Sequence, residues 1–286
     1  MPKVALLFIT IDNHNQPKIW NKFLKNNKYF NIYCHPKYPQ NVTDTFLKNN
    51  IISNLAQTKW GHLVLAYYEL LKAAYKNKDN YKFVFVSNSC IPVKSSHEVF
   101  KILTKDNATY VDTRNKMSKW DYEHRFKAYE SYLKKFNINK YNYIKHSGWF
   151  SINREHVQVL LDHKELFRFF NKIEAGDENF LTILKANHMK LQEKIITCVY
   201  WDQTIYPKYL KEKNKLWAIY DSTTDPEKKK QIKEIINKKK KKVAIDKSHP
   251  KSYKALTKKD ILGFKNDGCL FARKIDKDAK ITVNFK

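Results

Sequence analysis

Short apolar runs alternate with longer amphipathic ones along this chain, and this alternation predicts strands and helices in turn. The expected strands are mostly apolar and give way to small or polar side chains where they end. Because such runs are apolar on both faces, they are typical of strands buried inside a sheet. The expected strands cover residues 4–10, 30–35, 82–89, 108–113, 149–153 and 194–201.

The expected helices lie between these runs, where apolar side chains recur at helical spacing among good helix formers. Pro17 stands near the start of the first helix, which is a position that proline tolerates. Ser95 or Ser96 is placed to cap a later helix. The expected helices cover residues 17–26, 60–76, 95–103, 154–163 and 177–187.

Strands that alternate with helices predict an α/β fold, with a mainly parallel sheet covered by helices on both faces. In such sheets, ligands gather at the carboxyl ends of the strands. The polar residues that directly follow the strands are therefore the first candidates for a functional site. They are Thr10, Asp12, His35, residues 87–89 and Asp202.

The composition indicates a folded enzyme-sized chain that we expect to form a single domain over residues 1–286. Hydrophobic residues make up 42% and aromatic residues 14% of the 286 residues, which excludes a disordered chain because burial offsets the entropy of folding. No apolar run approaches the ~20 residues of a membrane span. The apolar start lacks a small-residue cleavage site, so we interpret it as a strand and not as a signal peptide.

The four cysteines, at positions 34, 90, 198 and 269, are far apart in the sequence. They form no CxxC pair, which argues against a zinc ribbon, and they indicate no disulfide framework. A reducing compartment is the simpler interpretation, so we expect a cytoplasmic or viral-factory-like location.

The formal net charge of +27 predicts attraction to polyanions, such as nucleic acid, an anionic membrane or a phosphate-bearing substrate. Lysine is abundant throughout the chain, so the charge alone decides little. It is densest at residues 221–247, for which we favour an exposed helix or a flexible excursion with solvated charges. A polyanion-binding segment is the alternative.

Several short motifs carry a more specific signal, and they follow one another along nearly the whole chain. They are WGHLVLAYYELLKAA at 60–74, FVFVSNSCIPV at 83–93, HSGWFSINREHVQVLL at 146–161, GDENFLTIL at 176–184, CVYW at 198–201, HPKSY at 249–253 and CLFARKID at 269–276. In this order they resemble the core-2/I-branching β-1,6-N-acetylglucosaminyltransferases and their plant relatives.

This resemblance implies a GT-A type glycosyltransferase fold and inverting transfer from a nucleotide sugar, often UDP-N-acetylglucosamine. The expected partners are a UDP-sugar donor and a glycan or glycoprotein acceptor. Such a transfer needs a carboxylate that accepts the proton of the acceptor hydroxyl, and positive charge that holds the departing phosphates.

Glu178 is the candidate catalytic base, because it matches the glutamate that has this role in the family. It stands in Gly-Asp-Glu at an expected helix start, where the helix dipole would favour its ionised form. From the helix alone, a carboxylate that only caps the helix would be the simpler interpretation. We expect that capping role for Asp177, which we also place at the acceptor site.

No metal ion or other cofactor is expected. Most GT-A enzymes hold a divalent ion with an Asp-x-Asp after a central strand, but residues 87–89 read Ser-Asn-Ser, which are poor ligands for such an ion. The Asp-x-Asp at 276–278 follows no recognisable nucleotide-binding strand. None of the ten histidines forms an i, i+4 pair.

The resemblance implies that basic side chains replace the metal. Lys274 matches one of these side chains. Lys251 lies where the family has arginine or lysine, and a lysine keeps the charge but loses the bidentate fork. Arg273 is adjacent, and the sequence leaves open whether it or Lys274 faces the phosphates. In a chain with 55 lysines and arginines, solvated surface charge is the competing interpretation.

The remaining candidates divide between donor and acceptor. Thr10, His35 and Ser87 are assigned to the nucleotide sugar, since they stand at the ends of expected strands, where such folds bind ligands. Trp201 matches an aromatic residue that stacks on the acceptor sugar, although a buried tryptophan is more often part of a core. We expect Trp149 to form the floor of the acceptor site.

Two other functions stay open. One is a polyanion- or nucleic-acid-binding protein on the same scaffold that uses residues 238–242. The lysine run lacks interleaved aromatic side chains, so nucleic acid is not an expected partner. The other is a metal-dependent or retaining transferase of another GT-A family, which the missing carboxylates at 87–89 disfavour. The sequence also departs from animal family members, because neither their membrane anchor nor their disulfide-stapled stem is evident.

Overall fold

The computed structural model describes residues 2–25, 27–113, 117–202, 204–247 and 249–282. The chain forms two compact units. The first consists of Met1–Cys198 together with Lys254–Lys286, and the second consists of Val199–Tyr253. A single functional domain over both units stays a prediction.

The first unit is built on a six-stranded sheet with the strand order β2-β1-β3-β6-β5-β7. β1 is parallel to β2 and β3, and β5 is parallel to β7, whereas β6 is antiparallel to β3 and β5. The expected mainly parallel sheet is therefore confirmed, with β6 as the reversed strand. The strands are β1 Lys3–Thr10, β2 Phe30–Pro36, β3 Asn80–Ser87, β5 Thr109–Val111, β6 Ser151–Asn153 and β7 Leu191–Glu193.

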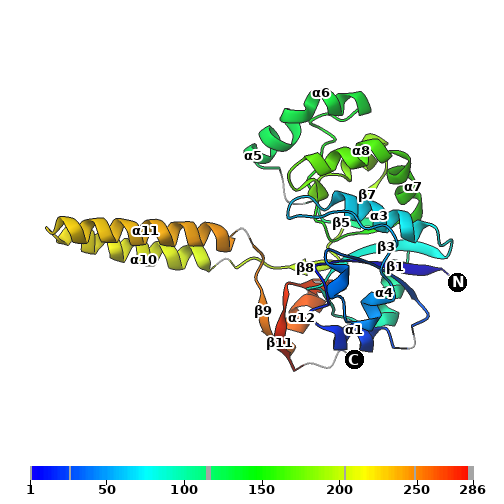
Figure 1. Ribbon diagram of the computed structural model, residues 1–286, viewed down its shortest axis with the longest axis horizontal. Coiled ribbons are helices and arrows are strands. Elements are labelled where there is room, and N and C mark those ends of the chain that lie inside the picture. The colour runs from blue at the N-terminus through cyan, green and yellow to red at the C-terminus, as the bar shows by residue number, and fades with distance from the viewer. Residues whose placement is uncertain (1, 26, 114–116, 203, 248, 283–286) are drawn as a thin grey trace. The chain divides into compact units, whose positions relative to one another are not determined.

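Helices cover both faces of this sheet, as the alternation of the sequence predicts (Figure 1). The side chains of β1 alternate between two separate hydrophobic cores, with Leu7 in one and Leu6 in the other. This explains why the run is apolar at nearly every position. Helices α3 Val64–Tyr75, α7 Arg154–Asp162 and α8 Lys164–Phe169 pack into the first core, and α1 Pro17–Phe23 and α4 Ser96–Leu103 pack into the second.

Smaller elements complete the first unit. A three-stranded sheet has the order β4-β10-β8, and β9 pairs with β11. These elements are β4 Ile91–Pro92, β8 Thr197–Val199, β9 Tyr253–Leu256, β10 Phe271–Arg273, β11 Ile275–Ile281, α2 Thr45–Lys48, α5 Lys119–Asp121, α6 Glu130–Leu133, α9 Thr182–Ala186 and α12 Lys258–Asn266. A π-helical turn at Tyr122–Phe126 follows α5, and short 3-10 helices cover Pro39–Asn41, Lys127–Tyr129, Lys134–Phe136, Phe170–Lys172 and Gly176–Glu178.

Most of the expected strands and helices form, and many of them are shorter than predicted. Ser95 is the N-cap of α4, where its hydroxyl and Glu98 form a capping box, so the first of the two expected caps is confirmed. The strand expected at 194–201 shrinks to β8. The helix expected at 60–76 begins at Val64, because Gly61 adopts a positive φ of 76° and keeps the preceding residues in a loop.

The continuous helix expected at 177–187 is wrong. The segment forms the 3-10 turn Gly176–Glu178 and then, after a break, α9. Tertiary contacts explain the break. The Asn179 side-chain amide donates to the Ile144 carbonyl at 2.9 Å, and the Thr182 hydroxyl accepts from the Ile144 N–H at 3.0 Å. Local propensity cannot reveal contacts with a segment that lies so far away in the sequence.

The cysteines correct a second expectation, because Cys198 and Cys269 form a disulfide. Cys198 lies in β8, Cys269 lies just before β10, and these two strands are neighbours in the three-stranded sheet. Since 71 residues separate the two cysteines, the spacing alone gave no sign of the pair. Cys34 and Cys90 are free and buried, as expected of small hydrophobic side chains. The expectation of a reducing compartment rested on cysteines that indicate no disulfide, and this disulfide removes that support.

The second unit contains a helical hairpin of α10 Ile205–Ser222 and α11 Pro226–Lys247. Tyr209, Ile232 and Ile236 are buried in this hairpin, and the Lys239 ammonium lies 2.7 Å from the Glu212 carboxylate. The lysine-rich segment is therefore helical from Pro226 onwards. Among the helices of the described ranges, none is long and apolar enough to cross a membrane.

Candidate active site

The carboxyl ends of β1, β2 and β3 bring three predicted site residues to one edge of the sheet. Ile9 pairs in register with His35 on one side and with Ser87 on the other, and Thr10 follows Ile9. Thr10, His35 and Ser87 are all buried. The parallel order of the strands therefore gathers them as the sequence predicts.

Thr10 and His35 are engaged by the protein itself. The Thr10 hydroxyl lies 3.8 Å from the Cys34 thiol, and the His35 Nε2 atom accepts a hydrogen bond from the Ala56 N–H at 2.8 Å. Burial lowers the pKa of His35, which favours the neutral ring that can accept this bond. These two side chains shape the edge, and their contact with a nucleotide stays a prediction.

A hydroxyl cluster and a guanidinium lie at the end of β3. The Ser87 and Ser89 hydroxyls are 3.1 Å apart, and the Ser89 carbonyl accepts from the Ile275 N–H at 2.9 Å. This bond ties the start of β11 to the serine turn. The charge of Arg273, just before it, opposes the rise in the pKa of the Cys90 thiol that burial causes.

Trp149 reaches the same edge because β6 is antiparallel, so that the residues preceding it lie where the parallel strands end. The Arg273 guanidinium lies 4.4 Å from the centre of the Trp149 ring, a distance typical of a cation–π contact. Among the described residues, the Arg273 Nε atom has no hydrogen-bond partner although it is buried. Arg273 and the adjacent Lys274 are both partly buried.

The carboxylates of Asp177 and Glu178 lie on the 3-10 turn Gly176–Glu178, which backbone contacts fix firmly. The Ala175 N–H donates to the Gly61 carbonyl at 2.8 Å, and the His146 N–H donates to the Glu178 carbonyl at 2.7 Å. A β-carbon on Gly176 would lie 1.9 Å from the Phe170 carbonyl oxygen, so the turn requires glycine at this position.

Glu178 is held between two cations. Its Oε2 atom lies 3.2 Å from the Arg125 guanidinium and 3.9 Å from the Lys145 ammonium, and its side chain is 39% exposed. Asp121 binds the same two cations, at 3.1 Å and 3.2 Å. Burial opposes ionisation of Asp121, but hydrogen bonds from Ser118 and the two cations lower its pKa. The result is a network of two carboxylates and two cations, with Glu178 as the member open to solvent.

Sequence reasoning missed Arg125, Lys145 and Asp121. Arg125 and Asp121 lie in a segment that none of the quoted motifs covers, and 55 lysines and arginines conceal any single important one. Lys145 directly precedes the motif at 146–161, which was the only signal for it.

Asp177 differs from its neighbour. Burial, together with the charge of Glu178, raises the pKa of Asp177 to about 6. Its Oδ1 atom is buried without a hydrogen-bond partner among the described groups. The capping role expected for Asp177 is wrong, since no side chain caps the turn. The helix-dipole argument for Glu178 is also wrong, because a single 3-10 turn lacks the aligned peptides of a helix.

Gly148 explains why the motif at 146–161 contains a glycine. The Tyr67 hydroxyl donates to the Gly148 carbonyl at 2.9 Å, and a β-carbon on Gly148 would lie 2.7 Å from that hydroxyl. Burial and the charge of Asp177 raise the pKa of Tyr67 well above its usual value, so the hydroxyl stays a donor.

His146 joins two of the motifs. Its Nε2 atom accepts from the Leu181 N–H at 3.2 Å, and burial lowers the pKa of His146 to about 4, which keeps the ring neutral. The motifs at 146–161 and 176–184 are thus in direct contact, and His146 is placed to support the turn that carries Glu178.

Trp201 and Lys251 belong to the second unit. Trp201 is 50% exposed, so it is not the core tryptophan that was the competing interpretation. The Lys251 N–H donates to the Tyr200 carbonyl at 2.8 Å, and the Lys251 ammonium lies over the Tyr253 ring. The Asp202 carboxylate accepts hydrogen bonds from the N–H and the hydroxyl of Thr204. The donor and acceptor roles of Trp201 and Lys251 stay predictions.

The aspartates at 276 and 278 lie in β11, where the Asp276 carbonyl accepts from the Gln16 side-chain amide at 2.9 Å. Within the part of the chain that the structure describes, no three His, Cys, Asp or Glu side chains form a group that could hold a metal ion.

The mainly parallel sheet with helices on both faces is an α/β fold, and charged and hydroxyl side chains lie at its carboxyl edge, where such folds bind ligands. The chain belongs to the core-2/I-branching enzyme family, whose model matches residues 4–244. This confirms the resemblance that the motifs predict.

Glycosyltransferase BC10 of Oryza sativa subsp. japonica is a similar protein, 26% identical over 179 residues. The matched region covers 59% of this chain and 43% of that protein, so the chain spans less than half the length of this curated relative.

Two solved structures share limited similarity with the chain. Galactosyltransferase LgtC, in complex with donor and acceptor sugar analogues, has a TM-score of 0.35 and 12% identity, covering 80% of this chain and 83% of that one. The bifunctional glycosyltransferase WbbM, in its apo form, has a TM-score of 0.35 and 12% identity over 69% and 40%.

Proposed function

We propose that this chain is a metal-independent, inverting glycosyltransferase that moves a sugar from a UDP-sugar to an acceptor hydroxyl. One observation carries the proposal: the turn with Asp177 and Glu178 and the guanidinium of Arg273 both lie at residues 148–149. A β-carbon on Gly148 would lie 4.0 Å from the Asp177 Oδ2 atom, and the Arg273 guanidinium lies 4.4 Å from the centre of the Trp149 ring. A proton acceptor and a cation for phosphate thus lie close to one segment. Membership of the family and the name of the rice relative support the same reaction class.

Glu178 is the proposed base. The acceptor hydroxyl gives its proton to the Glu178 carboxylate while its oxygen attacks the anomeric carbon of the donor. The bond from that carbon to the phosphate oxygen breaks, and UDP leaves with the bonding electrons. A single displacement of this kind inverts the anomeric centre. The exposure of Glu178 lets an acceptor reach it, and general-base assistance contributes about 10²–10⁴-fold in rate.

Arg273 is the proposed partner of the departing phosphates. A guanidinium can hold two phosphate oxygens at once, and the contact with Trp149 orients it. The serine hydroxyls at 87 and 89 stand where metal-binding carboxylates would be needed, and Arg273 lies beside this turn. This supports the replacement of a metal ion by basic side chains, with Lys274 and Lys251 as further candidates.

Donor binding tests the proposal directly. We would measure the thermal unfolding of the chain with UDP-, GDP- and CMP-linked sugars, in EDTA and in Mn²⁺. A UDP-sugar at ~100 times its dissociation constant should stabilise the chain by about 2.7 kcal/mol in EDTA. Arg273→Ala should abolish the shift, whereas Lys277→Ala, which removes an exposed charge nearby in the sequence, should keep it.

A shift in thermal unfolding that appears only with Mn²⁺ would show that the proposed metal independence is wrong. The absence of a shift with every nucleotide sugar would refute the function itself.

A further inference from the structure

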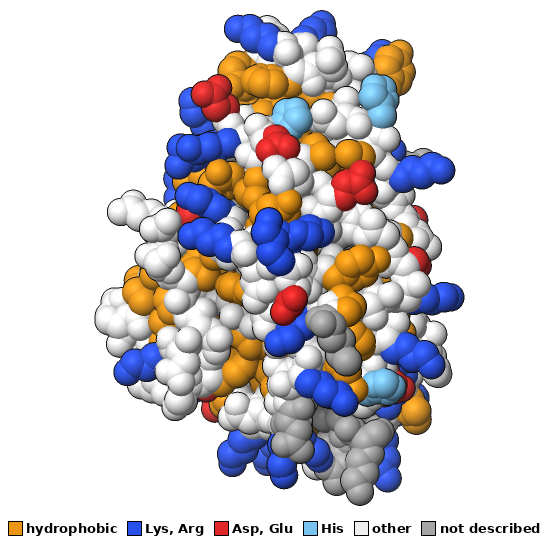
Figure 2. Space-filling view, turned by 90° about the vertical axis from the view of Figure 1, so that its right-hand side faces the viewer, with side chains coloured by type: hydrophobic (Ala, Val, Ile, Leu, Met, Phe, Trp, Pro, Cys, Tyr) orange, Lys and Arg blue, Asp and Glu red, His pale blue; other side chains and the backbone are white. Residues whose placement is uncertain are grey.

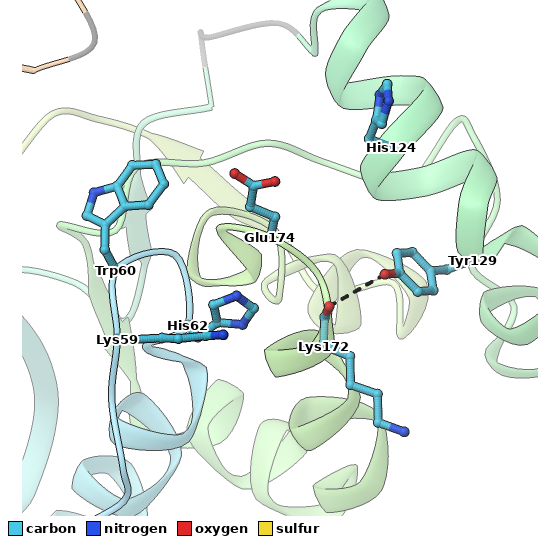
Figure 3. Close-up of a pocket in the computed structure, with 7 residues that line it drawn as sticks. All are labelled: Lys59, Trp60, His62, His124, Tyr129, Lys172 and Glu174. Atoms are coloured by element: carbon cyan, nitrogen blue, oxygen red, sulfur yellow. Dashed lines mark hydrogen bonds between the residues drawn. The ribbon is translucent and has the colours of Figure 1, made fainter. Parts of the chain in front are cut away.

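A cavity of about 390 Å³ opens in the first unit (Figure 3), and its lining includes Glu174, which precedes the turn that carries Glu178. Its size lies within the 300–1,000 Å³ typical of small-molecule sites. One wall comes from the loop before α3, with Trp60 and His62, and the opposite wall carries His124 and Tyr129. Glu174 lies between these walls. None of the site residues assigned above accounts for this cavity.

Both walls of the cavity are joined to Glu178. The Gly61 carbonyl, between Trp60 and His62, accepts from the Ala175 N–H at 2.8 Å, and the Ala175 carbonyl accepts from the Glu178 N–H at 2.9 Å. On the other wall, His124 precedes Arg125, whose guanidinium contacts the Glu178 carboxylate at 3.2 Å. The turn that carries Glu178 is therefore held by the same segments that form the two walls of the cavity.

The cavity exposes aromatic surface. Trp60 is 76% exposed, and Trp120, which is 46% exposed, stacks on His124 with ring centres 4.6 Å apart. Exposed tryptophan side chains gain nothing from burial within the chain, and they are enriched where a partner covers them. The C–H face of a sugar ring is apolar, while its hydroxyls project around the rim, so an aromatic ring is a natural platform for it.

Polar groups line the same cavity. The His62 Nδ1 atom lies 2.7 Å from the Asn171 carbonyl, and a proton on Nδ1 leaves Nε2 as an acceptor. Glu174 adds a carboxylate, and Lys59 and Lys172 add ammonium donors. The cavity therefore offers hydrogen-bond donors and acceptors, and groups of both signs of charge. Such a lining suits a neutral ligand with many hydroxyls better than a polyanion.

We propose that this cavity binds a neutral sugar unit of the acceptor, outside the unit whose hydroxyl reacts, with Trp60 as its stacking platform. The inference rests on the proposed transferase function for its meaning as an acceptor subsite. It predicts that longer acceptors bind more tightly, because the outer unit reaches the cavity.

Oligosaccharide binding tests this subsite. The probes are mono-, di- and tetrasaccharides of galactose, N-acetylgalactosamine and xylose, and a sialylated tetrasaccharide, measured by calorimetry. The wild-type chain should bind a neutral tetrasaccharide about tenfold more tightly than its monosaccharide, and Trp60→Ala should remove that gain. Trp60→Phe should retain most of it. Tyr141→Ala is the matched control, because Tyr141 is 85% exposed and does not line the cavity.

The outcomes separate this inference from the transferase proposal. Equal binding by Trp60→Ala and wild type, a preference for the sialylated probe, or no binding of any probe by the wild type would contradict the subsite. Loss of binding in Trp60→Ala, in a chain that binds no nucleotide sugar, would support a carbohydrate site and refute the transferase.

Discussion

The charged network around Glu178 and the lysine-rich hairpin α10–α11 differ in how their charges are held. Around Glu178, Arg125 and Asp121 are almost completely buried, and each cation touches both carboxylates. In the hairpin, the pair of Lys239 and Glu212 is about half exposed, and most other lysines are exposed.

This difference shows that the density of charge is a poor guide to chemistry in this chain. Exposed ion pairs contribute only about 0–1 kcal/mol, since water screens them, whereas partly buried networks fix geometry. On the face shown in Figure 2, lysine and arginine side chains are dispersed among hydrophobic and uncharged ones rather than gathered in one band. The burial and pairing of charges mark the site, and their number does not.

The largest expected effect is a loss of stability when the turn Gly176–Glu178, which carries Glu178, is altered. Gly176→Ala would place a β-carbon 1.9 Å from the Phe170 carbonyl oxygen, so we expect a loss of several kcal/mol in the free energy of unfolding, or failure to fold. Gly263→Ala is the control. It lies in helix α12, its β-carbon would meet no described atom within 4 Å, and the change should stabilise the chain by about 0.5–1 kcal/mol. Urea titration of both variants checks this, and equal stability of Gly176→Ala and wild type would contradict the turn's role.

The next effect concerns pH. The raised pKa of Asp177, about 6, means that the folded chain binds its proton more tightly than the unfolded chain, where the pKa is near 3.8. Asp177 therefore costs stability above pH 6, and this cost fades as the pH falls to about 4. Asp177→Asn should be more stable than wild type at pH 7, by at most ~3 kcal/mol, and the advantage should vanish near pH 4. Urea titrations from pH 4 to pH 7 test this, and a difference that is constant with pH would disprove it.

The smallest effect is expected in the hairpin. The triple change of Lys240, Lys241 and Lys242 to glutamine removes three exposed charges, and the free energy of unfolding should change by no more than about 0.5 kcal/mol. The thermal shift with a UDP-sugar should also be unchanged. A tenfold weaker donor affinity in this variant would show that the hairpin belongs to the site. The distinction between a functional network and a hairpin of solvated charges would then be wrong.

The sequence predicts the sheet well, because β1 needs apolar side chains on both faces and few other structures tolerate such a run. The sequence also predicts that Thr10, His35 and Ser87 lie close together, since the ends of parallel strands meet at one edge of a sheet. Arg125 and Lys145 could not be found in this way. Their role depends on contacts with Glu178 that span 53 and 33 residues, and no local pattern encodes such contacts.

The same limit explains the other errors. The pairing of Cys198 with Cys269 follows from the order of strands in a small sheet, and the break before α9 follows from contacts with Ile144. Both are tertiary effects that override local preference. For the glycines at 148 and 176, the sequence motifs already contain the residues. The structure adds the physical reason, because a β-carbon at either position would collide with a neighbouring atom.

UDP release by Glu178→Gln is the measurement that tests the central claim most directly. Glutamine keeps the size of the side chain but cannot accept the proton, so the variant should keep the donor-induced thermal shift and lose ~10²-fold or more in kcat. Glu174→Gln, on the same loop, is the matched control and should keep kcat, with any loss confined to the acceptor KM. A Glu178→Gln variant that releases UDP within a few-fold of the wild-type rate, in the presence of an acceptor, would contradict the account.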